Sequence, residues 1–291
     1  MKRGKSRRLF KKKKSHSNQR LGCIIAIIVL IPICYGLYLY YQQYSVQHSS
    51  KPQIETSVSL PTPSGKDLEI PISLIPRQEQ IIRHKGYTVS YNKDLKIPNW
   101  VSYELTRQET KGKEQRGDNF IADPLVKGAI ATNADYARSG YDKGHMAPAA
   151  DMKWSPDVMK ESFYFSNMCP QHPQLNRRGW KNLEEKIRDW AVADSAIIII
   201  CGPIIDKPSK TNKKNKVAVP ERFFKVILSP FVKPARGIGF LFNNRQAVEP
   251  LSTYAVSIDS IEKLTHMDFF SPLPDEIENA VEANADYYQW P

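Results

Sequence analysis

The chain has 291 residues, of which 41% are hydrophobic, so it can form one large domain or two small ones around a substantial core. Its formal net charge of +12 is concentrated at one end, because ten of the 42 basic residues and no acidic residue fall in positions 1–20. The other 32 basic residues nearly balance the 30 acidic ones, so the overall charge is weak evidence for nucleic-acid binding.

Residues 21–41 form an uncharged apolar run of the length that crosses a bilayer core. The basic block lies only on its N-terminal side, so the positive-inside rule predicts a cytoplasmic tail at 1–20 and a single transmembrane helix at 21–41. The rest of the chain is then exported, which predicts a single-pass protein of the cell membrane with its main domain in the periplasm or outside the cell. A cleaved signal peptide is the alternative, but the run exceeds the usual apolar core of such a peptide and no small-residue cleavage site follows in 42–51.

Residues 42–80 are rich in Pro, Ser, Thr and Gln, which is typical of a stalk that holds a domain away from a membrane. The main domain is therefore predicted at 81–291. Within it, alternating apolar residues predict paired strands at 87–91 and 100–106.

Four further elements surround the most informative part of the chain. Ser155 followed by Pro156 predicts the start of a short helix, and the apolar run 163–166 predicts a buried strand. Apolar residues at helical spacing predict the strongest helix at 178–193. The run SAIIIIC at 195–201 then predicts a fully buried central strand that ends at Gly202-Pro203.

The C-terminal part adds more strands and helices. They are two strands at 222–228 and 237–243, a helix opened by a capping box at 259–262, and an amphipathic helix at 275–283. The elements do not follow a regular βαβ alternation, which favours an α+β domain with a largely antiparallel sheet.

Two cysteines, Cys169 and Cys201, lie in the predicted exported domain, both at the ends of predicted core strands. A disulfide and two buried free thiols are both compatible with this placement. The spacing of Cys and His residues does not indicate a zinc site.

The run YDKGHMAPAAD at 141–151 shows neither helical nor strand periodicity, and Gly144 and Pro148 interrupt it. We therefore expect an irregular loop, the kind of segment in which catalytic residues concentrate. His145 lies near its centre and is the candidate general base, because a histidine can change its charge near neutral pH. A structural histidine beside a glycine is the alternative.

Amide and carboxylate side chains follow downstream, at the start of the strongest predicted helix. Asn176 offers a neutral carbonyl oxygen of the kind that Mg²⁺ accepts as a ligand. Glu184 lies about 12 Å further along a helix, too far to bind the same ion directly, so we expect it to hold an ion-bound water. In the alternative interpretation Asn176 only caps the helix, and Glu184 only pairs with Lys181 or Arg188.

Three segments, DKGHMAPAADM, FYFSNMCPQ and LNRRGWKNLE, occur in this order. Together they resemble the DNA/RNA non-specific endonuclease family, of the endonuclease G-like type, over about 87–270. The resemblance implies a ββα-metal (His-Me finger) domain and phosphodiester hydrolysis that depends on Mg²⁺, with Mn²⁺ as a substitute.

The resemblance also implies roles for single residues. His145 would be the general base that activates water, Asn176 the single direct protein ligand of the metal, and Glu184 the residue that holds the metal's waters. Arg116 would neutralise the phosphate and Asn167 would position the site.

One position departs from the family pattern, because Lys143 stands where the family usually has arginine. Lysine keeps the positive charge but loses the two-pronged grip on a phosphate. We assign Lys143, Arg177 and Arg178 to substrate binding.

The expected substrates are DNA and RNA. No base-reading module is recognisable in the sequence, so contacts to phosphates should dominate, with weak sequence preference and strong salt dependence. The lysine-rich loop 207–216 either extends this surface or is a solvated variable loop.

The leading hypothesis is a membrane-anchored nuclease, with homodimer formation left open. The rivals are an inactive nucleic-acid-binding membrane protein, for example in DNA uptake or secretion, and a purely structural one. The presence of His145, Asn176 and Glu184 favours an active enzyme.

Overall fold

The computed structural model describes residues 68–205 and 217–291, which belong to one unit spanning Pro61–Pro291. The predicted cytoplasmic tail, the predicted anchor at 21–41 and the loop 207–216 lie outside the described residues. Among the described residues, no helix is both long enough and apolar enough to cross a bilayer.

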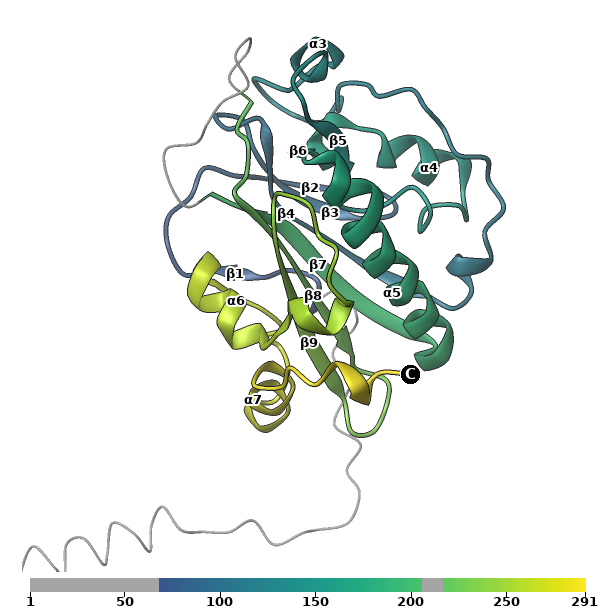
Figure 1. The fold of residues 1–291 in the computed structure, drawn as a ribbon, viewed down its shortest axis with the longest axis vertical. Helices are drawn as coiled ribbons and strands as arrows, with labels where there is room; N and C mark the ends of the chain where they lie inside the picture. Colours follow the sequence, from purple (N-terminus) through teal and green to yellow (C-terminus); the bar gives the residue numbers. More distant parts are fainter. Residues whose placement is uncertain (1–67, 206–216) are drawn as a thin grey trace, which may run out of the picture. The chain divides into compact units, whose positions relative to one another are not determined.

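A seven-stranded sheet organises the described residues, with the strand order β10-β9-β8-β7-β4-β3-β2 (Figure 1). All its pairings are antiparallel, which confirms the predicted α+β class with a mainly antiparallel sheet. The strands are β2 (Gln80–Arg83), β3 (Thr88–Asn92), β4 (Ile97–Thr106), β7 (Ala196–Ile204), β8 (Arg222–Ser229), β9 (Arg236–Asn243) and β10 (Ala255–Val256).

Two two-stranded ribbons and five helices complete the described fold. The ribbons are β5 (Asp142–His145) with β6 (Met168–Gln171), and β1 (Ile72–Ser73) with β11 (Met267–Asp268). The helices are α3 (Asn133–Tyr136), α4 (Pro156–Ser162), α5 (Lys181–Asp194), α6 (Ile258–Thr265) and α7 (Asp275–Glu282). Shorter turns are the 3₁₀ segments η1 (Glu109–Lys111), η2 (Phe165–Asn167), η4 (Leu251–Tyr254) and η5 (Tyr287–Gln289), and the π-helical segment η3 (Leu175–Trp180).

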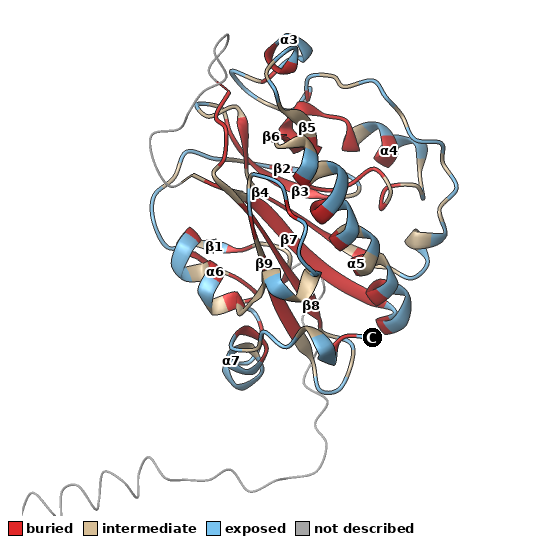
Figure 2. Ribbon diagram, in the orientation of Figure 1, coloured by how far each residue is buried: buried red, intermediate tan, exposed pale blue. Residues whose placement is uncertain are grey.

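The central strand β7 is buried on both faces, as Figure 2 shows for the middle of the sheet. Ile197, Ile199 and Cys201 belong to the core cluster beneath α5, whereas Ile198 and Ile200 belong to the cluster beneath α6 and α7. Successive side chains of a strand point to opposite faces, so a strand covered on both sides must be apolar throughout. This explains the unbroken apolar run that predicted a central strand.

The described elements thus form layers around the sheet. Helix α5 covers one face together with the β5–β6 ribbon, and α6 and α7 cover the other (Figure 1). The chain order β5, β6, α5 gives two antiparallel strands followed by a helix. His145 ends β5, and Asn176 lies in η3, the turn that leads into α5.

The prediction of an irregular loop over 141–151 was wrong at its start, because Asp142–His145 forms strand β5. Its partner β6 lies more than 20 residues away in sequence, and Gly144 packs tightly against Gln171, where a Cβ atom would come within 2.4 Å of the Gln171 side chain. Local periodicity cannot reveal a strand whose partner is supplied by tertiary structure. Beyond His145 the chain turns without regular structure, as expected.

Two neighbouring predictions also need correction. The run 163–166 is buried but is not a strand: the chain turns through η2, and β6 begins only at Met168. A fully buried segment is apolar in sequence whatever its backbone conformation, so the apolar run does not distinguish a strand from a turn. Helix α5 begins at Lys181, not at 178, because the preceding residues form the π-helical segment η3.

The ends of two other elements differ from the predictions. Strand β7 continues through Gly202 to Ile204, where its pairing with β8 accommodates Pro203. Helix α6 is capped by Ser257, whose hydroxyl accepts a hydrogen bond from the Ser260 amide, and not by the predicted box at 259–262.

Residues 68–80, predicted as part of the stalk, belong to the folded domain. Leu68 is fully buried in the core beneath α6 and α7, and β1 pairs with β11. The prolines of this segment lie between short extended stretches. The composition of the segment therefore resembled that of a linker.

Candidate active site

A cleft of about 470 Å³ opens between the end of β5, the start of α5 and the segment that carries Arg116. Most of the predicted site residues line this cleft. The lining side chains that carry charge or hydrogen-bonding groups are Arg116, Lys143, His145, Asn176, Arg177, Lys181, Glu184, Glu185 and Arg188.

His145 lies in the wall of this cleft and is only 8% exposed. The rings of Phe163 and Phe120 lie 5.0 and 5.6 Å from its ring, and its Nε2 atom has no hydrogen-bond partner among the described residues. Burial, with the positive charges of Arg116 and Lys143, lowers the pKa of His145 to about 3. The imidazole is therefore neutral at physiological pH, and its two positively charged neighbours weaken it as a base in the free protein.

Asn167 fixes the backbone that follows His145. Its side-chain Oδ1 accepts a hydrogen bond from the Ala147 amide at 2.9 Å, and its Nδ2 donates to the Ala147 carbonyl at 2.8 Å. Its own carbonyl oxygen accepts a hydrogen bond from the Met146 amide. Asn167 is fully buried, and these contacts are all with the protein backbone.

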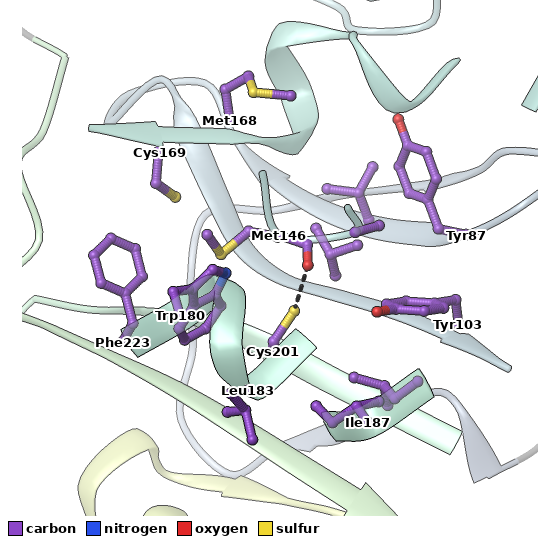
Figure 3. Packing of buried hydrophobic residues seen from close by; sticks show 14 of the residues in the cluster. Tyr87, Tyr103, Met146, Met168, Cys169, Trp180, Leu183, Ile187, Cys201 and Phe223 are labelled. Carbon is purple, nitrogen blue, oxygen red and sulfur yellow. Dashed lines mark hydrogen bonds between the residues drawn. The ribbon is translucent and has the colours of Figure 1, made fainter. Parts of the chain in front are cut away.

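Three side chains hold the same backbone from beneath. The indole Nε1 of Trp180 donates to the His145 carbonyl at 3.3 Å, and the thiol of Cys201 donates to the Met146 carbonyl at 3.2 Å (Figure 3). The Nζ atom of Lys225 lies 3.5 Å from the same Met146 oxygen and 4.6 Å from the centre of the Trp180 ring. Lys225 is fully buried, which is rare for a lysine.

Both cysteines of the described domain are buried free thiols. Burial raises the pKa of Cys169 well above its ordinary value, so this thiol stays protonated and unreactive. Of the two states that the sequence left open, the structure contains the reduced one.

The amide of Asn176 is oriented by Asp142. Its Nδ2 donates to Asp142 Oδ2 at 2.9 Å, which leaves Oδ1 as the atom available to a ligand. Arg177 grips the same carboxylate with two hydrogen bonds of 2.7 and 2.8 Å. Burial alone would raise the pKa of Asp142, but the hydrogen bonds from Arg177 and Asn176 outweigh it and lower the pKa. Asp142 therefore stays ionised and keeps the amide in place.

Glu184 lies one turn before Arg188 on α5, and both side chains line the cleft. Burial raises the pKa of Glu184 to about 8, although the charge of Lys225 opposes this rise. Arg188 is held by a 2.8 Å ion pair to the fully buried Asp151, which also accepts a hydrogen bond from Tyr103. A guanidinium is thus fixed beside the carboxylate.

Two cations flank the cleft from the opposite side. Lys143 lies 3.9 Å from the centre of the Phe120 ring and donates to Asn133 Oδ1 at 2.8 Å. The Arg116 guanidinium carbon lies 5.4 Å from the centre of the Phe163 ring. Because these aromatic rings also surround His145, both cations are positioned relative to the candidate base.

Not every predicted substrate-binding residue is free to act. The guanidinium of Arg177 is occupied by Asp142, although its side chain remains 68% exposed. Arg178 does not line the cleft and borders a separate hollow beside Asn182 and Ala247.

The sequence interpretation overlooked several contributors. Arg188 could have been recognised by its spacing of four residues from Glu184 on the strongest helix. The roles of Asp142, Trp180 and Lys225 depend on contacts between residues more than 30 positions apart, which no local signal reveals.

The residues of the cleft fit a hard divalent cation such as Mg²⁺. Asn176 Oδ1 is a neutral oxygen donor held in place by an ionised carboxylate, and the Glu184 carboxylate lines the same cleft. Such a set, with one amide and one carboxylate, leaves most coordination positions to water and substrate oxygens.

Comparisons with known proteins identify the family of this chain. The sequence profile of the DNA/RNA non-specific endonuclease family matches residues 64–276. A nuclease from Nostoc sp. is 30% identical over 250 residues, covering 81% of this chain and 88% of that protein. Human mitochondrial endonuclease G is 32% identical over 213 residues, covering 67% of this chain and 71% of the human protein.

A solved structure of the EndoG/EndoGI complex, described as the basis of EndoG inhibition, has a similar fold. The TM-score is 0.64 at 28% sequence identity, and the match covers 69% of this chain and 89% of that chain. The family match begins at residue 64, which agrees with the burial of Leu68. The chain therefore belongs to the DNA/RNA non-specific endonuclease family, with an endonuclease G-like fold, and is a nuclease of that family.

Proposed function

We propose that this nuclease hydrolyses DNA and RNA with Mg²⁺ as its metal, Mn²⁺ as a substitute, and His145 as the general base. One observation carries the proposal: the buried Nε2 of His145 has no partner and lies in the same cleft as Asn176 and Glu184. An unpaired buried polar atom is costly, and one that faces a cleft is available to a substrate or water.

The reaction can be written with the residues of the cleft. His145 accepts a proton from a water molecule, whose oxygen forms a bond to phosphorus while the bond from phosphorus to the leaving oxygen breaks. The leaving oxygen takes up a proton from solvent. When bound, the metal would neutralise charge on the phosphate and stabilise the leaving oxygen, with Asn176 as its direct protein ligand.

The cations of the cleft assist His145 only when substrate is present. Arg116 and Lys143 disfavour protonation of His145 in the free protein. A bound phosphate cancels their charge and raises the proton affinity of the imidazole, so the base strengthens when it is needed. Arg188, fixed by Asp151, adds a third positive group for the phosphate.

Phosphate recognition also supports a substrate range without sugar or base preference. The charged groups of the cleft are the type that contacts phosphate oxygens. We therefore expect cleavage of both DNA and RNA, with a rate that falls as salt concentration rises.

The decisive test uses the purified full-length chain on plasmid DNA and on RNA, with Mg²⁺, with Mn²⁺ and with chelator. Cleavage of both substrates that chelator abolishes and Mg²⁺ restores is the expected result. Binding without cleavage in every metal would overturn the proposal and favour the inactive nucleic-acid-binding alternative.

Glu184→Gln should reduce cleavage by a factor of roughly 100 or more, because it removes the carboxylate that holds the metal's waters. Asp189→Asn is the matched control, since Asp189 lies on the same helix, is exposed and does not line the cleft. Equal loss of activity in both variants would count against a specific role for Glu184.

We further propose that residues 21–41 anchor the nuclease in the cell membrane, with the tail 1–20 in the cytoplasm. The charge asymmetry around the apolar run supports this topology. Protease added to intact cells should then degrade the domain and spare the tail, and protection of the domain would contradict the proposal. Homodimer formation stays a prediction.

A further inference from the structure

A second cluster of carboxylates lies on the face of the sheet opposite the cleft. It joins two groups of three acidic residues that share Glu282, and the oxygen atoms within each group lie within 4.8 Å of one another. The five residues are Asp259 and Glu262 of α6, Asp268 of β11, and Glu278 and Glu282 of α7.

Glu282 stands out within this cluster because it is buried. Glu282 is only 7% exposed, and its Oε1 atom has no hydrogen-bond partner among the described residues. A buried carboxylate oxygen without a partner carries a large desolvation cost, which a bound cation or a proton can offset.

The protein itself supplies little compensation. None of the ion pairs found in the described part of the chain joins one of the five carboxylates to a lysine, arginine or histidine. The Phe269 amide donates to Glu262 Oε1 at 2.8 Å, which satisfies one oxygen of one member. Burial and the surrounding acidic groups raise the pKa of Glu282 to about 9.

We propose that these carboxylates form a calcium site, separate from the catalytic metal, that ties α7 and β11 to α6. The ligand set consists only of carboxylate oxygens, which selects a hard cation over zinc or copper. Calcium accepts six to eight oxygens in flexible geometry, whereas magnesium demands near-ideal octahedral geometry and gives up its waters reluctantly. Ligands from three separate segments favour the larger ion.

The position of the site gives the ion a structural role. Helices α6 and α7 pack against β9 and against each other, and Asp268 pairs in β11 with Ile72 of β1. A bound ion would therefore link the C-terminal helix to the ribbon through which the chain enters the folded domain. Its effect should appear in stability and not in the chemistry of the cleft.

The test measures thermal unfolding of the full-length Asn176→Ala protein, with calcium and with chelator. This background removes the direct protein ligand that we propose for the catalytic metal, which weakens calcium binding in the cleft. Saturating calcium, at about 100 times its dissociation constant, should raise the unfolding temperature by roughly 5–10 °C. Magnesium should give a smaller shift, and an equal shift would overturn the assignment to calcium.

Glu282→Gln in the same background should abolish the calcium shift, because it removes the ligand common to both groups. Glu276→Gln is the matched control, since Glu276 is exposed on the same helix and outside the cluster. Asp268→Asn provides a second disruption should Glu282→Gln fail to fold, and its calcium shift should be reduced.

Equilibrium dialysis with calcium should show bound ion in the Asn176→Ala parent and none in the Glu282→Gln variant. The proposal is overturned when the parent neither binds calcium nor gains stability from it. A parent that ignores calcium, with a Glu282→Gln variant that is more stable in chelator, would identify a shared proton in place of a cation. Absence of nuclease activity would leave this result untouched, because unfolding is the readout.

Discussion

The ammonium of Lys225 lies 3.5 Å from the carbonyl oxygen of Met146, fully buried beneath the residue that follows the candidate base. Lys225 pairs with Cys201 across β7 and β8, and the Cys201 thiol donates to the same oxygen. The floor of the cleft is thus held by the central sheet itself, and a buried positive charge faces the site from within the core.

Lys225→Met should lower cleavage by about 10- to 100-fold while leaving the fold intact. Methionine fills a similar volume without a buried charge, so the free energy of unfolding should change by no more than about 2 kcal/mol. The variant should also raise the pKa of Glu184 further, since the charge of Lys225 favours the ionised carboxylate. Rates measured at limiting Mg²⁺ should then reach their plateau at a higher pH.

Lys263→Met is the control for this substitution, because Lys263 is an exposed lysine on α6. A Lys225→Met protein with the wild-type rate and pH profile would show that the buried charge has no part in the reaction.

His145→Ala should fold normally and lose cleavage by at least about 100-fold, the usual contribution of a general base. The side chain is enclosed by Phe120 and Phe163, but its Nε2 atom makes no hydrogen bond. Its removal therefore breaks no hydrogen bond of that atom, and we expect the fold to persist. Circular dichroism and single-turnover cleavage of plasmid DNA measure the two effects. Near-normal activity would place the base elsewhere.

Asp142→Asn should weaken apparent Mg²⁺ affinity by about 10-fold or more, because an amide no longer forces Asn176 to present its oxygen. The measurement is the Mg²⁺ concentration that gives half-maximal cleavage. Arg177→Ala keeps the contact between Asp142 and Asn176, so this control should need nearly the same Mg²⁺ concentration as the wild type. Equal effects of the two substitutions would argue against orientation by Asp142.

Lys143→Arg should lower the KM for DNA by about 3- to 10-fold, since a guanidinium can hold a phosphate with two hydrogen bonds. Steady-state kinetics at fixed salt measure the change, and Lys143→Ala should shift KM in the opposite direction. An unchanged KM in the arginine variant would mean that Lys143 contacts only Asn133 and Phe120 and does not bind the substrate.

Asp123 should make stability depend on pH in the acid range. Burial would raise its pKa, but hydrogen bonds from His84 and Ser166 outweigh this and lower it. A lowered pKa in the folded state means that the stabilisation is complete above about pH 4 and is lost as the pH falls through the folded value.

Urea unfolding from neutral pH to about pH 3 checks this prediction. Asp123→Asn should be less stable by about 1–3 kcal/mol at neutral pH and should lose less stability on acidification. Parallel curves for the two proteins would assign the acid sensitivity to other carboxylates.

Much of the sheet could be predicted because its strands are buried in ways that leave a local mark. The run of Ile197–Cys201 is apolar on every residue since both faces of β7 are covered, and α5 carries its apolar residues at helical spacing. By contrast β5 has only four residues, three of them charged or glycine, and exists because β6 pairs with it. Its strand character could not be read locally.

The candidate site divides in the same way. The identities of His145, Asn176 and Glu184 come from motifs whose residues are close in sequence, and these motifs suffice to indicate a nuclease. Tertiary structure alone brings Asp142 to Asn176, places Lys225 beneath Met146 and gathers carboxylates from α6, β11 and α7 around Glu282. The sequence by itself determines the family and the reacting groups, because these depend on residue type and order. Orientation, burial and charge at those groups depend on distant neighbours, which only the folded chain decides.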